Sequence, residues 1–559
     1  MTALLTDNLP LLAGAPNGIK KLRELILELA VRGKLVPQDP SDEPASELLK
    51  RVAEEKARLV AEGKIKKQKP LTERDDEAPE IELPAGWAWA RLSNVVNVLN
   101  GRAYKKEELL DAGTPVLRVG NLFTSNHWYY SNLTLEEDKY CNPGDLLFAW
   151  SASFGPFIWQ GERSIYHYHI WKLDFYVQGQ LSKHYLYNFL LEQTQEIKAA
   201  GHGVSMVHMT KEKMEKLVVP VPPLAEQHRI VAKVDELMAL CDRLETQQAD
   251  TESAHAELVQ ALLGSLTQAA DAGDFAASWQ RLAEHFHTLF TTESSIDALK
   301  QTLLQLAVMG KLVPQDPSDE PASELCKSIE AEKQRSVAAK KIKATPRLEP
   351  VSTDEELFTA PSSWVWVRMG DICRPISSGS TPSSELFKYD EGIPFLKVYN
   401  IRNQEIDFEY KKQFVSPEHH AEKMKRSALV PGDVVMNIVG PPLGKVAIIP
   451  DTFPEWNCNQ AIVFFGLIAP VSPQYIYTFL KEGSFLKNIV LIGTAGQDNI
   501  SVAKSKNIAV PLPPLAEQHR IVAKVDQLMA LCDQLKTRLT QARQLNEQLA
   551  TALVEKAVA

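Results

Sequence analysis

The sequence predicts an α+β chain in which two mixed α/β domains are separated by long helices that form an antiparallel coiled coil, with a pseudo-two-fold internal repeat. Three observations support this fold class. Two segments of the chain occur twice, one of them has the apolar spacing of a long helix, and the segments between the repeats contain short strand-like runs. With 559 residues, the chain is also long enough for at least three structural units.

The repeated segments are nearly identical. GKLVPQDPSDEPASEL at Gly33–Leu48 recurs at Gly310–Leu325, and PPLAEQHRIVAKVDELMALCD at Pro222–Asp242 recurs at Pro513–Asp533, with Glu236 replaced by Gln527. This pattern indicates two domains that bind different targets on a common frame. Duplication followed by drift is the alternative, although drift should not spare the repeats while it rewrites the domains. The domains share only Trp87-Ala88-Trp89 with Trp364-Val365-Trp366, Pro143-Gly144-Asp145 with Pro431-Gly432-Asp433, and Val219-Pro220 with Val510-Pro511.

The repeat that begins at Pro222 predicts a long helix. Leu224 to about Leu266 contains no proline and one glycine, so a helix of roughly 40 residues, or about 60 Å, is expected. Its apolar residues alternate at spacings of four and three, the pattern of a coiled-coil seam that needs a partner helix. The simplest partner is the other copy, in antiparallel orientation; two separate amphipathic helices, each packed on its own domain, are the alternative. The predicted seam contains Ile230, Val234, Leu237, Cys241 and Leu244, and in the second copy Ile521, Val525, Leu528, Cys532 and Leu535, continuing through Leu539, Ala542, Asn546, Leu549 and Leu553.

The repeat that begins at Gly33 predicts two helices joined by a turn. An apolar stripe from Ile19 to Leu29 predicts a helix that ends at Gly33. The turn follows at Pro37–Ser41, and we expect Ser41 or Asp42 to cap the next helix.

These patterns divide the chain into six segments. They are a helical region with its linker at residues 1–83, a first mixed domain at 84–220, a central long helix at 221–268, a second helical repeat with its linker at 269–360, a second mixed domain at 361–510, and a C-terminal helix at 511–559. Within the domains we predict strands at Val116–Val119, Leu146–Trp150, Tyr166–Ile170 and Val434–Ile438, and helices at Tyr185–Ala199 and Pro473–Val490.

Composition excludes several classes of protein. The six cysteines form no CxxC pair, so a disulfide framework or a thiolate zinc site is not expected. The N-terminus lacks the pattern of a secretory signal and no apolar run has the length of a membrane span, so we expect a cytoplasmic protein. The net charge of −10 lies almost entirely in the helical segments, because both mixed domains are close to neutral. Neutral domains permit DNA binding but do not indicate it.

Sequence patterns for catalysis are missing. Gly33-Lys34-Leu35, Gly310-Lys311-Leu312 and Gly444-Lys445-Val446 lack the Ser or Thr of a phosphate-binding loop. Gly440-Pro441-Pro442-Leu443 lacks the amide and the aromatic ring of an amino-methyltransferase motif. Glu284-His285-Phe286-His287 has no further ligands nearby, so we interpret it as helix surface rather than a metal site.

Motifs in both halves resemble those of type I restriction-modification specificity subunits. The resemblance covers nearly the whole chain and rests on motifs that occur twice in the same order. The N-terminal repeat is similar to a subgroup with extended conserved regions. The motifs are Gly86-Trp87-Ala88-Trp89 followed by Arg91-Leu92, the Pro-Gly-Asp turn, Ile376–Pro382, Ile393–Val398, Gly493–Ile500, and the sequence Val-Pro-x-Pro-Pro-Leu-Ala-Glu-Gln-His-Arg-Ile-Val that opens each long helix.

The resemblance implies a non-catalytic DNA-targeting subunit. In that family, each recognition domain reads one half of a split, asymmetric site in double-stranded DNA, and the paired helices set the gap and dock two methyltransferase subunits. Two restriction subunits add translocation and cleavage. S-adenosylmethionine, ATP and magnesium are then expected on the partner subunits, and no cofactor, metal or membrane is expected for this chain.

DNA contacts are expected from polar and basic residues on loops, because base-edge contacts specify a sequence while phosphate contacts position the protein. The candidates in the first domain are Arg102, Tyr104, Lys105, Arg118 and Asn121; in the second domain they are Ser378, Ser380, Thr381, Lys397, Asn400 and Arg402, with Lys423, Lys425 and Arg426 for phosphates.

Two functions compete with this interpretation. One is a fused restriction or methylation enzyme, against which the missing cofactor motifs speak. The other is a coiled-coil adaptor for proteins, or a DNA-binding protein that works without methyltransferase partners. DNA binding with and without a methyltransferase partner would separate them.

Overall fold

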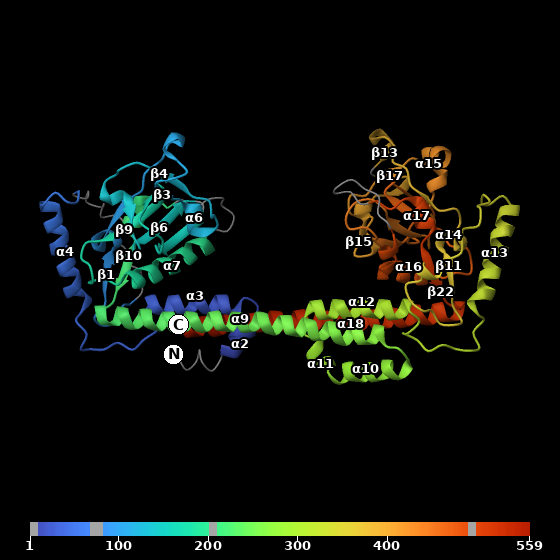
Figure 1. Cartoon of the computed structure of the whole chain (residues 1–559), viewed down its shortest axis with the longest axis horizontal. Helices are drawn as coiled ribbons and strands as arrows, with labels where there is room; N and C mark the ends of the chain where they lie inside the picture. Colours follow the sequence, from blue (N-terminus) through green and yellow to red (C-terminus); the bar gives the residue numbers. More distant parts are fainter. Residues whose placement is uncertain are drawn as a thin grey trace. The chain divides into compact units, whose positions relative to one another are not determined.

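The structure, a computed structural model, describes residues 9–66, 82–151, 153–200, 209–388, 390–489 and 499–558. The chain divides into two compact units (Figure 1). The N-terminal unit comprises residues 1–252 and 541–559, and the C-terminal unit comprises residues 253–540. Each unit contains one of the two mixed domains and a set of helices.

Two long helices contribute to both units. Helix α9 spans Leu224–Gln268 and has 45 residues, and α18 spans Leu515–Val558 and has 44. In the N-terminal unit the first part of α9 meets the last turns of α18, and in the C-terminal unit the first part of α18 meets the last turns of α9. The helices are therefore antiparallel, which confirms the predicted fold class of mixed domains on long antiparallel helices.

The N-terminal unit adds a third helix to this pair. Helix α3 (Gly18–Val31), preceded by α2 (Leu9–Gly14), lies along α9 (Figure 1). Arg23 of α3 bonds to Asp242 and Glu245 of α9 at 2.5 and 2.8 Å, while Lys21 donates to the Thr551 hydroxyl of α18 at 2.8 Å. The N-terminal repeat therefore supplies a helix that contacts both long helices.

The second helix of this repeat, α4 (Ala45–Ala61), begins three residues later than expected. Its N-cap position is Pro44, and no side chain caps it. Ser41 instead bonds to the Asp39 carboxylate through its amide and its hydroxyl, at 2.9 and 2.7 Å, and Asp42 pairs with Arg229. The predicted capping role of Ser41 or Asp42 is therefore wrong, because both side chains have other partners.

The first domain contains two four-stranded sheets. One has the order β2-β9-β6-β7 and is antiparallel; the other has the order β4-β3-β8-β5, with β3 and β8 parallel. Strands β1 and β10 pair antiparallel where the chain enters and leaves the domain. The strands are β1 Ala88–Arg91, β2 Val96–Asn100, β3 Thr114–Leu117, β4 Tyr129–Ser131, β5 Tyr140–Cys141, β6 Leu146–Ser151, β7 Ser153–Ile158, β8 Ser164–Tyr166, β9 Ile170–Phe175 and β10 Val218–Val221; the helices are α5 Leu92–Val95, α6 Val119–Phe123, α7 Lys183–Ala200 and α8 Lys211–Lys216, with short η2 Lys106–Glu108 and η3 Glu137–Lys139.

The C-terminal unit repeats the arrangement of helices. Helix α12 (Glu293–Val308) follows α10 (Ala272–Glu284) and α11 (Phe286–Leu289) and precedes α13 (Ala322–Ala338). Lys536 of α18 pairs with Asp297 of α12 at 3.0 Å, and Lys300 of α12 pairs with Asp533. Leu263 of α9 is buried in the same core. Helix α12 is therefore the counterpart of α3.

The second domain has the same two sheets. Their orders are β12-β21-β18-β19 and β13-β17-β14-β20, with β14 and β20 parallel, and β11 pairs with β22 at the entrance and exit. The strands are β11 Val365–Arg368, β12 Ser377–Ser378, β13 Phe387–Lys388, β14 Ile393–Leu396, β15 Ile401–Arg402, β16 Glu405–Ile406, β17 Phe414–Val415, β18 Val434–Asn437, β19 Val446–Ile448, β20 Asn457–Cys458, β21 Ile462–Phe465 and β22 Ala509–Leu512; the helices are α14 Met369–Ile372, α15 Pro417–Lys423, α16 Pro473–Glu482 and α17 Val502–Lys506, with short η4 Thr353–Glu355, η5 Ser384–Leu386, η6 Val398–Asn400, η7 Lys425–Ser427 and η8 Ser484–Asn488.

The apolar seam residues serve two kinds of contact. The first turns of each long helix are buried in the core of their own domain: Ile230 and Val234 share a core with Phe148, and Ile521 and Val525 share one with Phe479. Later turns of α18 pack against the other long helix, because Cys532, Leu528 and Leu535 share a core with Val259 and Leu263. Cys241 is buried, and Leu237 and Leu244 are half-buried, in the core of the N-terminal unit.

Three local predictions differ from the structure. Tyr166–Ile170 is not one strand, since β8 ends at Tyr166 and β9 begins at Ile170. The helix predicted at Pro473–Val490 stops at Glu482 because Gly483 has a φ of +86°, where glycine is favoured. Leu549 does not continue the seam: it is exposed, and its neighbour Ala550 is buried instead.

The described residues contain no helix that is long and apolar enough to cross a membrane.

Candidate nucleic-acid interface

Three loops meet at the same place in both domains. They are the glycine turn after β2 or β12, the end of β3 or β14, and the turn after β8 or β20. We call this arrangement the three-loop junction. In the first domain it contains Gly101, Arg118 and His167, and in the second Gly379, Lys397 and Asn459.

Matching backbone hydrogen bonds hold both junctions together. The His167 amide donates to Leu117 O at 2.9 Å, and the Asn459 amide donates to Leu396 O at 2.9 Å. The glycine turns repeat the match, since Gly101 N donates to Ile170 O and Gly379 N to Ile462 O, both at 3.2 Å. The next residues do the same: Arg102 N donates to Tyr166 O and Ser380 N to Cys458 O, both at 3.1 Å. The domains therefore share one backbone frame, although their sequences differ.

Both glycines are required by close approach of the backbone. A Cβ atom on Gly101 would lie 2.3 Å from His167 O, and one on Gly379 would lie 1.9 Å from Cys458 O. Neither distance is possible without moving the backbone. Asn100-Gly101-Arg102 and Ser378-Gly379-Ser380 thus occupy equivalent positions.

An asparagine shapes the loop that follows β3 or β14. Asn121 Oδ1 accepts a hydrogen bond from Arg118 N at 3.1 Å, and Asn400 Oδ1 accepts one from Lys397 N at 2.9 Å. The Asn400 amide also donates to Asp407 O and Tyr410 O. Asn400 is only 1% exposed, so the prediction that its side chain contacts DNA is wrong: it is used inside the loop. Asn121 is half-buried and bonds to His127 O at 2.8 Å in the same manner.

Aromatic and basic side chains line the junction of the first domain. Arg102 pairs with Glu108 at 2.8 Å and lies 5.4 Å from the ring centre of Tyr104, which stacks on His167. Arg118 is exposed and lies 5.1 Å from the ring centre of Tyr129. Arginine over an aromatic ring keeps its donors directed outward, which suits contacts to bases or phosphates. Lys105 is exposed next to this cluster.

The electrostatics of this junction favour neutral side chains below the surface. Burial raises the pKa of Tyr104, so its hydroxyl stays protonated. Burial also lowers the pKa of His167 to about 4, with further contributions from His169 and Arg118. His167 is therefore neutral at physiological pH and can accept or donate a hydrogen bond.

Sequence reasoning missed the turn between β8 and β9. His167, Tyr168 and His169 form this turn, and the Trp150 indole donates to Tyr168 O at 2.9 Å while its ring lies 5.0 Å from His169. Tyr168 is 40% exposed. The signal was the Tyr-His-Tyr-His run, which was interpreted as an alternating strand. Gln460 is the corresponding turn residue of the second domain.

The junction of the second domain carries hydroxyls, an amide and a lysine. Ser378 and Ser380 are half-buried on either side of Gly379, and the exposed Thr381 hydroxyl bonds to the Gln460 side chain. Lys397 lies 4.7 Å from the ring centre of Phe387. The two junctions therefore differ in chemistry while they share a backbone.

A basic and aromatic patch adjoins Lys397. Arg402 lies 4.2 Å from the ring centre of Tyr410 and 3.5 Å from Asp407. Lys411 lies over the rings of Tyr399 and Tyr410, at 5.6 and 5.4 Å. Lys411 was not among the predicted residues, because its approach depends on how the loop folds.

The predicted phosphate contacts are exposed. Lys423 ends α15, while Lys425 and Arg426 lie in η7, which contacts β12. Their charges therefore lie beside the strand that leads into the glycine turn at Gly379.

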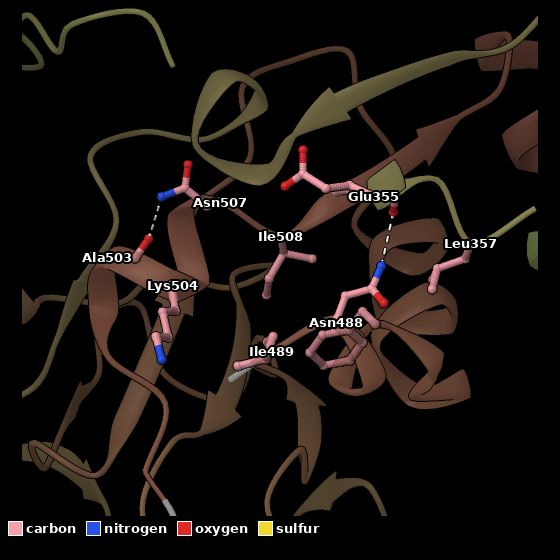
Figure 2. A pocket seen from close by; sticks show the side chains of 10 residues that line it. Glu355, Leu357, Asn488, Ile489, Ala503, Lys504, Asn507 and Ile508 are labelled. Carbon is pink, nitrogen blue, oxygen red and sulfur yellow. Dashed lines mark hydrogen bonds between the residues drawn. The ribbon is translucent and has the colours of Figure 1, made fainter. Parts of the chain in front are cut away.

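A separate cavity of about 270 Å³ lies beside the linker that precedes the second domain (Figure 2). Asn488 donates to Glu355 O across it at 3.0 Å. Arg368 binds the Glu355 carboxylate at 2.6 and 2.8 Å and lowers the pKa of Glu355 to about 2. The predicted linker 344–360 is thus fixed to the domain here. Most of residues 70–83, the corresponding linker of the first half, lie outside the described residues.

Within the described ranges, no group of His, Cys, Asp and Glu residues could hold a metal ion. The motif Gly493–Ile500 lies outside the described residues up to Asp498.

Comparisons with known proteins agree on one family. A family model described as the type I restriction modification DNA specificity domain matches residues 84–251 and 361–543. The chain is 37% identical to the specificity subunit of the type I restriction enzyme EcoAI of Escherichia coli, covering 97% of this chain and 94% of that one. It is 36% identical to the EcoEI specificity subunit of Escherichia coli, with the same coverage.

Two solved structures are also similar. A chain from a type I R-M system, described for complex assembly and conformational transition, has a TM-score of 0.48 and 18% identity over 85% of this chain and 98% of that one. The HsdS subunit from Thermoanaerobacter tengcongensis has a TM-score of 0.40 and 18% identity over 86% of this chain and 98% of that one. On the family model and the two Escherichia coli relatives, this chain belongs to the type I restriction-modification family of DNA sequence-specificity subunits.

Proposed function

We propose that each mixed domain recognises one half of a bipartite, asymmetric site in double-stranded DNA, and that the three-loop junction is the recognition surface. The observation that carries this proposal is the pair of matched junctions. Leu117–His167 and Leu396–Asn459 form the same backbone bond at 2.9 Å, while the exposed side chains around them differ. A constant backbone with variable side chains is suited to reading different bases in the same geometry.

The electrostatic attraction to DNA would come from local clusters rather than from net charge. In the first domain Arg118 and Lys105 are exposed near the junction, and in the second Lys423, Lys425 and Arg426 are exposed beside it. Such clusters supply phosphate contacts even in a domain that is neutral overall. Arg102, Lys397, Thr381 and Arg402 are then positioned for base edges or the adjoining backbone.

We also propose that the long helices set the gap between the half-sites and dock two methyltransferase subunits. Exposed leucines on these helices support docking: Leu545 and Leu549 in the N-terminal unit, and Leu258 and Leu531 in the C-terminal unit, are each between 45% and 57% exposed. Rows of exposed large apolar side chains usually mark an interface. Two restriction subunits would join this assembly.

In this proposal the chain targets other subunits and does not perform chemistry. S-adenosylmethionine, ATP and magnesium would bind to the partners, in the cytoplasm. The word "specificity" in the names of both Escherichia coli relatives supports a targeting role.

Methylated adenines can test the proposal. The chain would be expressed with a type I methyltransferase subunit in a host without other adenine methylation, and the modified sites mapped. One split motif is expected, and exchanging Thr381 and Lys397 for Ala should change the selectivity of one half only. Methylation without a split motif, or equal changes in both halves, would contradict the proposal. DNA binding by the chain alone, with no effect of the methyltransferase, would favour a stand-alone DNA-binding protein.

A further inference from the structure

A buried carboxylate joins three segments at the start of α9. Glu226 is 1% exposed. Its Oε2 accepts a hydrogen bond from the Trp87 indole at 3.0 Å, and its Oε1 accepts one from the Gln38 amide at 3.1 Å. Trp87 lies at the entrance of the first domain and Gln38 in the turn of the N-terminal repeat. One side chain of the long helix therefore holds both the domain and the repeat.

The next residues of the same helical turn add further contacts. Gln227 Oε1 accepts from Ser182 N at 2.7 Å, directly before α7 of the domain, and its amide donates to Pro222 O at 2.9 Å. Arg229 binds the Asp42 carboxylate at 2.6 Å. We call Glu226, Gln227 and Arg229 with these partners the first-turn cluster.

The second long helix carries the same first-turn cluster. Glu517 is fully buried and accepts from the Trp364 indole at 3.0 Å and from the Gln315 amide at 2.6 Å. Gln518 accepts from Ser472 N at 3.0 Å, and Arg520 binds Asp319 at 2.6 Å. Each contact corresponds atom for atom to one in the first cluster, although the domains between the repeats differ.

Such a cluster contributes more to geometry than to stability. Burial raises the pKa of both Glu226 and Glu517, which shows that each carboxylate is held against a desolvation penalty. An apolar contact of the same size would stabilise the joint at least as well, but apolar surfaces can slide and rotate. Directional hydrogen bonds from an indole, an amide and a backbone N–H permit one orientation.

We infer that the first-turn clusters are positioning elements: they fix the orientation of each recognition domain on its helix, and thereby make the chain selective for one gap length between the half-sites. This inference rests on the proposed function. Helix length alone would set an average gap. A domain that could rotate on its helix would accept gaps one base pair shorter or longer, since each base pair moves the second half-site along and around the DNA axis.

The test uses the chain assembled with its methyltransferase subunits. Duplexes carry the mapped site with the natural gap, or with a gap changed by one base pair in either direction, and initial methylation rates are compared. Trp87→Phe and Trp364→Phe remove only the indole donor, and each retains an aromatic ring in the core. Glu226→Gln keeps the side-chain shape and one acceptor oxygen. We expect each variant to reduce the preference for the natural gap by about fivefold, which corresponds to about one net hydrogen bond.

A natural difference between the repeats supplies the control. Glu236→Gln makes the first copy identical to the second at the only position where they differ, and the side chain is exposed, so its gap preference should stay that of the unmodified chain. If the cluster variants lose activity by the same factor on all three gaps, the cluster stabilises the fold only and the inference is overturned. If the unmodified chain directs no split-site methylation, the proposed function itself fails, which is a distinct result.

Discussion

The Trp87 indole nitrogen lies 3.0 Å from the Glu226 carboxylate, and Trp364 lies at the same distance from Glu517 in the other half of the chain. Each pair closes a joint between a domain that varies and a helix that does not. The carboxylates are buried, so a donor removed from either pair leaves an acceptor without compensation from water.

This relationship predicts a local loss of stability. Trp87→Phe and Trp364→Phe should each lower the free energy of unfolding by about 1–3 kcal/mol, because one buried acceptor loses its donor. Hydrogen exchange can locate the effect. We expect faster exchange in α7 for Trp87→Phe and in α16 for Trp364→Phe, with the other unit unchanged. Equal acceleration in both units would show that the joints are not independent.

A second prediction concerns the glycine turns. Gly101→Ala would place a Cβ atom 2.3 Å from His167 O, so the junction must shift. We expect DNA binding to the corresponding half-site to weaken by more than about tenfold, while circular dichroism shows intact helices. Gly120→Ala is the matched control, since its Cβ would meet Ser125 at an ordinary 3.4 Å. Normal binding by Gly101→Ala would place the recognition surface elsewhere.

A third prediction separates base contacts from phosphate contacts. Removing Arg118 or Lys397 should cost about 1–3 kcal/mol on the cognate sequence if the side chain reads a base. Removing Lys423, Lys425 or Arg426 should weaken binding to all sequences and reduce the salt dependence, by about 0.9 in the slope of log K against log salt per phosphate contact. Titrations at several salt concentrations measure both effects.

Lys327→Ala serves as the control for these titrations. Lys327 is exposed on α13 and pairs with Glu324, away from the junction loops. A Lys425→Ala variant with the salt slope of Lys327→Ala would remove Lys425 from the interface.

The sequence was sufficient for the architecture because the architecture is repeated and periodic. The 4-3 spacing from Ile230 to Leu244 predicted a long helix, and α9 is such a helix over Leu224–Gln268. The same spacing failed at Leu549, where the buried residue is Ala550. Periodicity gives the faces of one helix, but not the place where a third helix such as α3 alters which face is covered.

The site was less accessible to sequence reasoning because it forms through non-local contacts. His167 and Leu117 are far apart in the chain, and their backbone bond creates the junction. Lys397 could be selected from its charge, whereas the buried role of Asn400 depends on the loop that folds around it. Local composition does not contain that information.

The last prediction uses the lowered pKa of His167. Its value of about 4 lies below the ordinary 6.5, so between these values the unfolded chain binds a proton that the folded chain does not. The contribution of His167 to stability is therefore complete above pH 6.5 and is lost as the pH falls toward 4. DNA phosphates near His167 would raise its pKa, so binding should take up a proton, and affinity for the first half-site should increase as the pH is lowered from 7 to 5. His167→Asn, which copies the Asn459 of the second domain, should remove this pH dependence, while His285→Asn on the exposed surface of the C-terminal unit should not. Calorimetric binding in two buffers of different ionisation enthalpy measures the proton uptake; uptake that persists in His167→Asn would place His167 away from the DNA.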